Sequence, residues 1–476
     1  MKYTLGIDVG TTGTKTVLLS QNGDIIQGGY LGYEVKTYPD GRSTQDANDW
    51  TKAVIHTVRA ALEKADPGDI LGISLSAQGA TQVAVDKDGR TLDDAITWMD
   101  TRSSAECEYI ENALGKGKMY RKTGWATDET CDAPKILWIK RNLPQLYEKT
   151  DKFLSTVEFV NLFLTGRAML DPTNGAIREL YNIETGDYDD QILDVIETSR
   201  DKLPLAGKTG QLVGTVTKDA AEKTGLLQGT PVYLGAHDQY CASIGCGAVR
   251  PGDMLLSTGT AWVLLGITDK LLFTPSRIAA GVHPKEGLYG AMASLGGVGN
   301  ALKWVKDTFE SDYRTLDEIA KTRRQSARDV LVYPYFSGAA FPLRDASRAG
   351  RIDGLRLCHD KYDIALALME GVAFEVRLSL EKYKEAGADI RALKIMGGAS
   401  RSKVWCDIVG GVTGCEITVM DNAEACAQGA AEIAAVASGM LGEYGLSKKS
   451  SSILPPVDRE TAEFYNEKYQ KYKNGI

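Results

Sequence analysis

Histidine and closely spaced cysteines are scarce in this sequence. Its 476 residues include four histidines and eight cysteines, and no two cysteines form a C-x-x-C pair. Structural zinc sites usually combine such pairs with histidine, so none is expected here. Thiols scattered along a long chain are typical of a reducing compartment, and we therefore expect a cytoplasmic protein.

Long apolar runs and an excess of basic residues are also missing. No window reaches the ~18 uninterrupted apolar residues of a spanning helix, and Asp8 falls where a signal peptide would carry its apolar run. Lys and Arg number 55 against 63 Asp and Glu, a formal net charge of −8. Because affinity for nucleic acid rests on basic side chains, we expect neither a nucleic-acid nor a membrane partner.

The composition is that of a folded globular protein. Hydrophobic residues make up 43% of the chain and charged residues 25%, which excludes disordered, collagen-like and coiled-coil classes. The chain is too long for one ordinary core and suits two domains.

The first residues have the pattern of a β-hairpin, and that pattern recurs. Strand-like runs at residues 3–7 and 16–19 flank a turn rich in glycine and threonine. The triplet Thr-Gly-Thr at 12–14 is followed, after two intervening residues, by Val-Leu-Leu at 17–19. The same pattern occurs at 258–260 and 263–265, about half a chain away, and the two stretches align without a gap. This recurrence indicates a duplicated domain. We predict an α/β fold of two duplicated domains, residues 1–247 and 248–476.

The turn between Asp8 and Lys15 is the first candidate site. Gly10 and Gly13 permit close backbone approach, and successive N–H groups in a tight turn form a concave anion site. Asp8 lies at a strand end, where a carboxylate could hold Mg²⁺ through water. The alternative is a hairpin with an acidic residue at its edge. The second hairpin favours phosphate binding, because two facing turns can hold one polyphosphate.

Asp238 is the second candidate. It follows an apolar strand ending near Gly235 and opens a helical stretch of small residues. A carboxylate there could be a helix N-cap. It could equally be a general base at the carboxyl edge of a sheet, where α/β proteins bind ligands.

Two further stretches carry polar residues after predicted strands. Residues 397–402 read Gly-Gly-Ala-Ser-Arg-Ser between a strand and a helix, which is similar in kind to a nucleotide loop. Gln78, Trp98, Asp100 and Arg102 could line a cavity for a polyol; the alternative is a solvated Asp–Arg pair.

Taken in order along nearly the whole chain, these stretches resemble the FGGY family of carbohydrate kinases. The family belongs to the superfamily of sugar kinases, actin and heat-shock ATPases. The segments that carry the resemblance are 6–15, 133–138, 333–338, 350–355 with its continuation at 363–364 and 369–370, and 397–402. Among the subfamilies, residues 98–102 and 133–138 are most similar to xylulokinases. The resemblance implies two actin-like (ribonuclease H-like) ATPase domains with a central interdomain cleft.

The resemblance also implies roles for individual residues, with ATP, Mg²⁺ and a small sugar or polyol as ligands. Asp238 falls on the catalytic base and Asp8 on the carboxylate linked to Mg²⁺. The phosphates and adenosine of ATP would be held by Thr11, Thr12, Lys15, Thr258, Gly259, Thr260, Gly397, Gly398, Ala399 and Ser402. The acceptor would be held by Gln78, Trp98, Asp100, Arg102, Asp238 and Gln239. A homodimer is one assembly that the resemblance allows.

The sequence departs from the xylulokinase pattern at the acceptor positions. Ala77-Gln78 stands where Met-His is usual, Met99 replaces Asn, and His237 replaces Gly before the catalytic Asp. Asp238-Gln239 is similar to glycerol kinases. A ketopentose such as xylulose is therefore the first expectation for the acceptor, with glycerol, gluconate, ribulose or a linear signalling sugar as alternatives. A filament-forming or chaperone-like ATPase and a non-catalytic sugar-binding regulator are alternatives from other classes.

Overall fold

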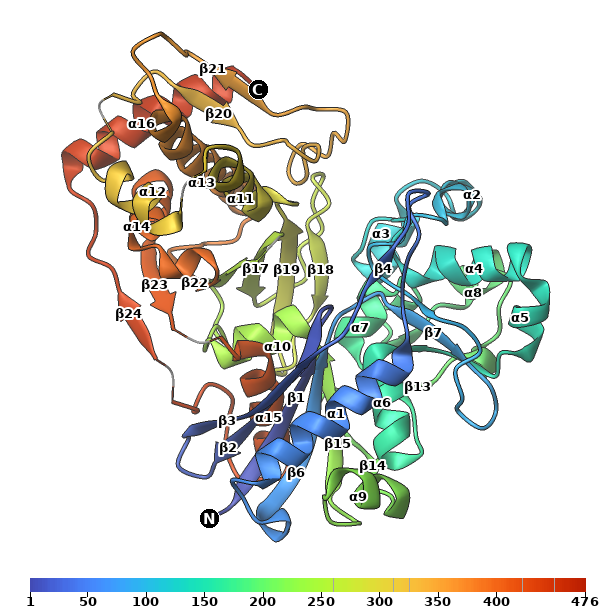
Figure 1. Ribbon diagram of the computed structural model, residues 1–476. Coiled ribbons are helices and arrows are strands. Elements are labelled where there is room, and N and C mark those ends of the chain that lie inside the picture. The colour runs from blue at the N-terminus through green and yellow to red at the C-terminus, as the bar shows by residue number, and fades with distance from the viewer. Residues whose placement is uncertain (260, 311, 325, 422, 449) are drawn as a thin grey trace.

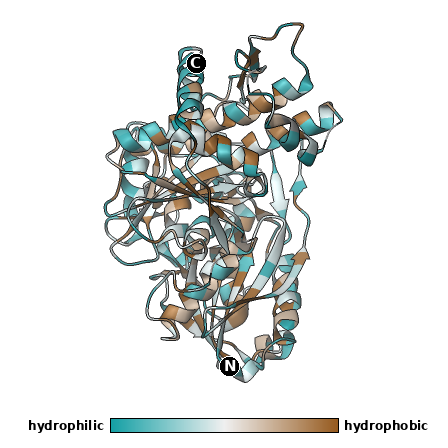
Figure 2. Ribbon diagram, turned by 90° about the vertical axis from the view of Figure 1, so that its left-hand side faces the viewer, coloured by the Kyte–Doolittle hydropathy of each residue, from teal (hydrophilic) through white to brown (hydrophobic). Residues whose placement is uncertain are grey.

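The computed structural model describes residues 1–476 except 260, 311, 325, 422 and 449. Figure 1 shows two halves, the first coloured blue to green and the second yellow to red. Each half is built around one larger sheet with helices packed against it. Figure 2 shows brown, hydrophobic residues along the inner strands and more teal residues on outer helices and loops.

The first half contains a six-stranded and a five-stranded sheet. The six-stranded sheet has the order β14 (Leu212–Thr215), β15 (Pro231–His237), β6 (Ile70–Ala77), β1 (Tyr3–Val9), β2 (Gly13–Ser20) and β3 (Ile25–Gly32). The five-stranded sheet has the order β4 (Lys36–Thr37), β5 (Ser43–Gln45), β8 (Ala95–Ile96), β7 (Gln82–Val85) and β9 (Lys152–Ser155). Two short pairs are β10 (Met169–Leu170) with β13 (Leu205–Ala206), and β11 (Tyr181–Asn182) with β12 (Asp187–Tyr188).

Helix α1 illustrates how the sequence determines the helices of this half. Asp46 caps its N-terminus by accepting a hydrogen bond from the N–H of Asn48, and Trp50, Val54 and Val58 lie on its buried face. The helices are α1 (Ala47–Leu62), α2 (Ser104–Leu114), α3 (Lys118–Thr123), α4 (Asp132–Asn142), α5 (Pro144–Lys149), α6 (Thr156–Thr165), α7 (Pro172–Ile177), α8 (Asp190–Val195), α9 (Lys218–Thr224) and α10 (Asp238–Gly245).

The second half is built around a seven-stranded sheet. Its order is β18 (Ala279–Val282), β19 (Tyr289–Ser294), β17 (Trp262–Thr268), β16 (Asp253–Thr258), β22 (Ala392–Gly397), β23 (Glu416–Met420) and β24 (Ser451–Ile453), and β20 (Leu331–Tyr333) pairs with β21 (Arg351–Asp353). Its helices are α11 (Val298–Thr308), α12 (Tyr313–Ala320), α13 (Lys361–Glu385), α14 (Lys403–Thr413), α15 (Ala425–Ala437) and α16 (Arg459–Asn474). Among the residues that the structure describes, no helix has the length and apolar character needed to cross a membrane.

The two halves repeat the same strand arrangement, but the gap-free alignment of their Thr-Gly-Thr triplets is wrong. In each half an antiparallel hairpin is followed by a strand parallel to its first arm: β1–β2 with β6, and β16–β17 with β22. The last residue pairs of the two hairpins are Val9 with Thr14 and Thr258 with Trp262. Thr258 therefore corresponds in place to Val9, because both residues end the first arm. The hairpin recurs, whereas the triplet falls at different places in it.

Helix α15 belongs to the second half in sequence but packs against the sheet of the first half. Figure 1 shows it beside β1 and α10. A β-carbon at Gly6 of β1 would lie 1.9 Å from the carbonyl oxygen of Ala427, and one at Gly429 would lie 1.8 Å from that of Cys241. Glycine is therefore required where these backbones meet. The division at 247/248 stays a prediction.

Candidate active site

Three parallel strands bring the candidate residues of the first half to one edge. Strands β1 and β15 each pair with β6 in parallel, so Val9, Ala77 and His237 end side by side. Asp8 precedes this edge, while Gln78 and Asp238 follow it directly. Loops at the carboxyl ends of parallel strands are where open α/β sheets bind ligands.

Asp8 and Asp238 are close enough to influence one another. The pKa of Asp8 is raised to about 7, chiefly by burial. The charge of Asp238 adds to this rise, and a hydrogen bond of 2.7 Å from Ser76 Oγ to Asp8 Oδ1 opposes it. A buried carboxylate beside a second carboxylate is stabilised by a cation. This arrangement fits Mg²⁺, which binds through one or two carboxylates and otherwise keeps water or phosphate oxygens.

Asp238 is the first residue of α10, but it is not the N-cap. The cap is His237, whose Nδ1 accepts a hydrogen bond of 3.3 Å from the N–H of Gln239. The N-cap interpretation of Asp238 is therefore wrong. The side chain of Asp238 is 30% exposed, and its Oδ1 has no hydrogen-bond partner in the described part of the chain. His237 Nδ1 lies 3.3 Å from that oxygen. Oδ1 itself is buried, so the exposure of the Asp238 side chain comes from its other atoms.

The hairpin between β1 and β2 is contacted by side chains from other segments. Thr11 Oγ1 accepts a hydrogen bond of 3.0 Å from Trp98 Nε1, and the carbonyl of Thr11 accepts one of 2.6 Å from Gln45 Nε2. Thr12 is exposed. Lys15 pairs with Asp8 across β1 and β2, and its Nζ lies 3.2 Å from Glu424. Lys15 therefore joins the hairpin to the start of α15, an arrangement that sequence reasoning missed.

Thr258 connects the second hairpin to the loop at 397–402. Its hydroxyl donates to the carbonyl of Met396 at 2.5 Å and accepts from the N–H of Ala399 at 3.0 Å, while its carbonyl accepts from the N–H of Gly398 at 2.7 Å. Gly397 has a φ of +93°, which favours glycine. The buried hydroxyl of Thr258 thus orders the loop, and a phosphate contact from it stays a prediction.

The remaining residues predicted for ATP occupy the two loops around Thr258. Among the described residues other than its chain neighbours, the nearest atom to a β-carbon built at Gly259 is the carbonyl oxygen of Ala261 at 3.6 Å, and Thr260 lies outside the described residues. Ala399 is buried below the loop. Ser402 caps α14 by accepting from the N–H of Trp405 at 3.0 Å and donates to Asp317 at 2.7 Å. Their contacts with adenosine or phosphate stay predictions.

The residues predicted for the acceptor fall into two kinds. Gln78 is buried, donates from Nε2 to Gln45 Oε1 at 2.8 Å, and has an Oε1 without a partner among the described residues, as has Gln239. Asp100 is fully buried and accepts from Nε and Nη2 of Arg102 at 2.8 and 2.7 Å. Both oxygens of Asp100 are therefore occupied, whereas Gln78 and Gln239 retain an acceptor for a hydroxyl.

Sequence reasoning missed Ser76 and Gln45. Ser76 could have been found as the neighbour of Asp8 on the adjacent parallel strand, once the register of β1 and β6 was known. Gln45 lies in a different sheet, and no local pattern connects it to Thr11 and Gln78.

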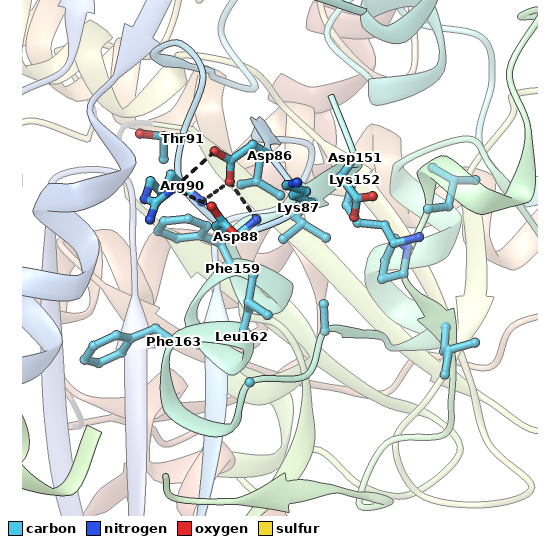
Figure 3. Close-up of a pocket in the computed structure, with 18 of the residues that line it drawn as sticks. Asp86, Lys87, Asp88, Arg90, Thr91, Asp151, Lys152, Phe159, Leu162 and Phe163 are labelled. Atoms are coloured by element: carbon cyan, nitrogen blue, oxygen red, sulfur yellow. Dashed lines mark hydrogen bonds and ion pairs between the residues drawn. The ribbon is translucent and has the colours of Figure 1, made fainter. Parts of the chain in front are cut away.

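A large cavity of about 1470 Å³ lies elsewhere in the first half. Figure 3 shows Asp86, Asp88 and Arg90 on one side of it, with the apolar side chains of Phe159 and Leu162 nearby. None of the described candidate residues lines this cavity.

Comparison with known proteins identifies the family. Residues 3–245 match the model of the FGGY family of carbohydrate kinases, N-terminal domain, and residues 254–438 match that of the C-terminal domain. The chain belongs to the FGGY family of carbohydrate kinases. This confirms the resemblance seen in the sequence and the duplicated actin-like α/β fold that it implied.

Individual relatives bear different substrate names. A xylulose kinase of Bacillus subtilis (strain 168) is 30% identical over 99% of this chain and 95% of its own length. A gluconokinase of the same organism is 26% identical over 93% and 89%. The crystal structure of a xyloylose kinase from Brucella ovis has a TM-score of 0.91 at 26% identity and covers 100% of this chain and 98% of its own.

Proposed function

We propose that this protein transfers the γ-phosphate of ATP to a hydroxyl of a small sugar, with the ketopentose xylulose as the acceptor. The observation that carries the proposal is the pair Asp8 and Asp238 at one sheet edge. Asp238 there has a side chain that is 30% exposed, and Asp8 is a buried carboxylate that a cation would stabilise. The choice of xylulose as the acceptor is supported by the relatives named xylulose kinase, one of which is 30% identical over nearly the whole chain.

In the proposed reaction Asp238 acts as the general base. Its carboxylate accepts the proton of the sugar hydroxyl, whose oxygen forms a bond to the γ-phosphorus as the bond between that phosphorus and the β–γ bridging oxygen breaks. ADP and a sugar phosphate are the products. Because the transition state is loose, most of the acceleration comes from positioning and from neutralising charge.

The phosphates would be held by the backbone N–H groups of the turn after Asp8 and by the hydroxyls of Thr11 and Thr12. Thr11 can still donate its hydroxyl proton, because Trp98 uses it only as an acceptor. Mg²⁺, held by Asp8, would neutralise charge on the phosphates when bound. Gln78 and Gln239 would accept hydrogen bonds from hydroxyls of the sugar through their unpartnered oxygens.

An aldonate such as gluconate is the second candidate acceptor, since a gluconokinase is also among the relatives. The deciding experiment is a coupled assay of ADP release with purified protein, ATP and Mg²⁺, in which D-xylulose, D-ribulose, D-gluconate and glycerol are compared by kcat/KM. We expect D-xylulose to give the highest value. If another acceptor gave a higher kcat/KM, that compound would take the place of xylulose as the proposed substrate. ATP consumption unaffected by all of them would favour an actin-like ATPase without a sugar substrate.

We also place the protein in the cytoplasm, where ATP and small sugars are available. A homodimer is proposed for its assembly. Light scattering coupled to size-exclusion chromatography tests this, with 51.6 kDa as the mass of one chain.

A further inference from the structure

Lys135 is a buried cation that binds main-chain carbonyls rather than a carboxylate. It lies on α4 and its side chain is inaccessible to solvent. Its Nζ donates to the carbonyl of Ala80 at 2.7 Å and to that of Thr97 at 2.9 Å. Burial lowers the pKa of Lys135, and the charges of Asp132 and Asp100 oppose this effect. A buried ammonium without an ion pair is costly, so its retention calls for a reason other than stability.

The two carbonyls belong to segments that carry candidate acceptor residues. Ala80 lies two residues after Gln78, and Thr97 immediately precedes Trp98. The segments also contact each other directly, because the N–H of Trp98 donates to Thr81 Oγ1 at 3.3 Å. Lys135 therefore holds both segments from the buried side.

Ala80 has an unusual backbone conformation. Its φ is +48°, in the left-handed region that residues with a β-carbon rarely adopt, and its side chain is buried. Such a conformation persists only where the surroundings enforce it, and it is often found at functional sites. The hydrogen bond from Lys135 to the carbonyl of Ala80 is a contact that can enforce it.

We propose that Lys135 is a positioning residue for the sugar acceptor: by binding the carbonyls of Ala80 and Thr97, it fixes the spacing of segments 78–81 and 97–100. Gln78 and Trp98 are thereby held where they face the substrate. The placement of the two segments follows from the contacts alone, whereas the effect on the acceptor rests on the proposed function. The residues predicted to contact adenosine lie on other loops. The hairpin predicted to hold the phosphates is contacted by Trp98, which donates to Thr11 Oγ1, so displacing this segment affects the acceptor directly and the phosphates through Thr11.

The experiment compares full-length wild type, Lys135→Met, Ala80→Gly and the double variant. Hydrogen–deuterium exchange is measured in peptides covering 78–82 and 97–100. The KM for ATP and the KM for the best acceptor of the panel are measured by ADP release. For Lys135→Met we expect exchange at least tenfold faster in both segments and an acceptor KM at least tenfold higher, with a smaller rise in the KM for ATP through the contact between Trp98 and Thr11. Ala80→Gly should relieve the strain and recover part of the acceptor KM in the double variant.

Two further variants separate positioning from general destabilisation. Lys468 is also buried, but it pairs with Glu370 in the second half; Lys468→Met/Glu370→Gln should lower Tm and leave the acceptor KM unchanged. If Lys135→Met does not fold, Lys135→Arg keeps the charge, and its longer planar group should still displace the two carbonyls and raise the acceptor KM.

Unchanged exchange in both segments overturns the proposal, and so does a lower Tm with both KM values unaltered. Should wild type show no acceptor-dependent turnover, the proposed function fails. The exchange measurement then decides alone whether Lys135 holds the segments.

Discussion

Ser76 donates a hydrogen bond of 2.7 Å from Oγ to Oδ1 of Asp8, and the two residues are register partners on the parallel strands β6 and β1. The bond stabilises the ionised form of Asp8, whose pKa burial raises to about 7. It therefore supports the protonation state that a cation requires.

Replacing Ser76 by Ala should weaken the response to Mg²⁺. Without the hydrogen bond the pKa of Asp8 rises further, and more of the carboxyl is protonated at pH 7. A hydrogen bond to a charged group contributes about 1.5–3 kcal/mol, so the half-saturating Mg²⁺ concentration should rise roughly tenfold or more. Titration of turnover with Mg²⁺ measures this. Ser74→Ala is the control, because the buried hydroxyl of Ser74 on the same strand has no hydrogen-bond partner among the described residues. Equal Mg²⁺ requirements in the two variants would contradict the assigned role of Ser76.

The stability of the metal-free protein should depend on pH through Asp8. Its pKa in the folded state is about 7, above the ordinary value of 3.8, so the folded state binds this proton more tightly than the unfolded state. The contribution of Asp8 to stability is therefore complete below pH 4 and is lost as pH rises through 7. With EDTA present, the Tm of wild type relative to Asp8→Asn should fall between pH 5 and pH 8. A difference in Tm that stays constant over this range would refute the shifted pKa.

Asp238→Asn should abolish transfer with little change in nucleotide binding. Asn cannot accept the hydroxyl proton as a carboxylate does, and a general base typically contributes 10²–10⁴-fold to the rate. We expect kcat to fall by about this factor, measured by ADP release at saturating acceptor. Calorimetry should give an ATP dissociation constant near that of wild type. Turnover within a few-fold of wild type would exclude Asp238 as the base.

Gly429→Ala should destabilise the protein, because its β-carbon would lie 1.8 Å from the carbonyl oxygen of Cys241. Backbone contacts of this kind cannot relax by a rotamer change, and overpacking costs typically 1–3 kcal/mol or more. Urea unfolding followed by fluorescence measures the loss. Gly442→Ala is the matched control, since no described residue beyond its chain neighbours lies within 4 Å of its β-carbon and its φ is not positive. Similar stability of both variants would show that the α10–α15 contact is not close.

Local patterns predicted much of the fold. The short β-type runs and glycine turn at the N-terminus predicted the β1–β2 hairpin. The order of motifs along the chain identified the family. Each of these motifs is a short stretch of sequence, so no tertiary contact was needed to interpret it.

The remaining features depend on contacts between distant residues. The position of Thr258 at the end of the first arm of its hairpin is defined by its pairing with Trp262. A gap-free sequence alignment contains no information about this pairing. The cap of α10 falls on His237 because its ring nitrogen reaches the N–H of Gln239, although Asp is the more common capping residue. Lys135 is part of a family motif, yet only the structure shows that its ammonium binds the carbonyls of Ala80 and Thr97.

Helix α15 joins the second half of the chain to the sheet that carries Asp8. Its backbone meets that of α10 at Gly429 and that of β1 at Gly6. Asp8 and Asp238 are connected independently of this helix, because β1 and β15 both pair with β6 and bring the two residues to one edge of the same sheet. The separation of the two carboxylates is therefore set by strand pairing within the first half, and bending of the chain near the 247/248 division would leave it unchanged.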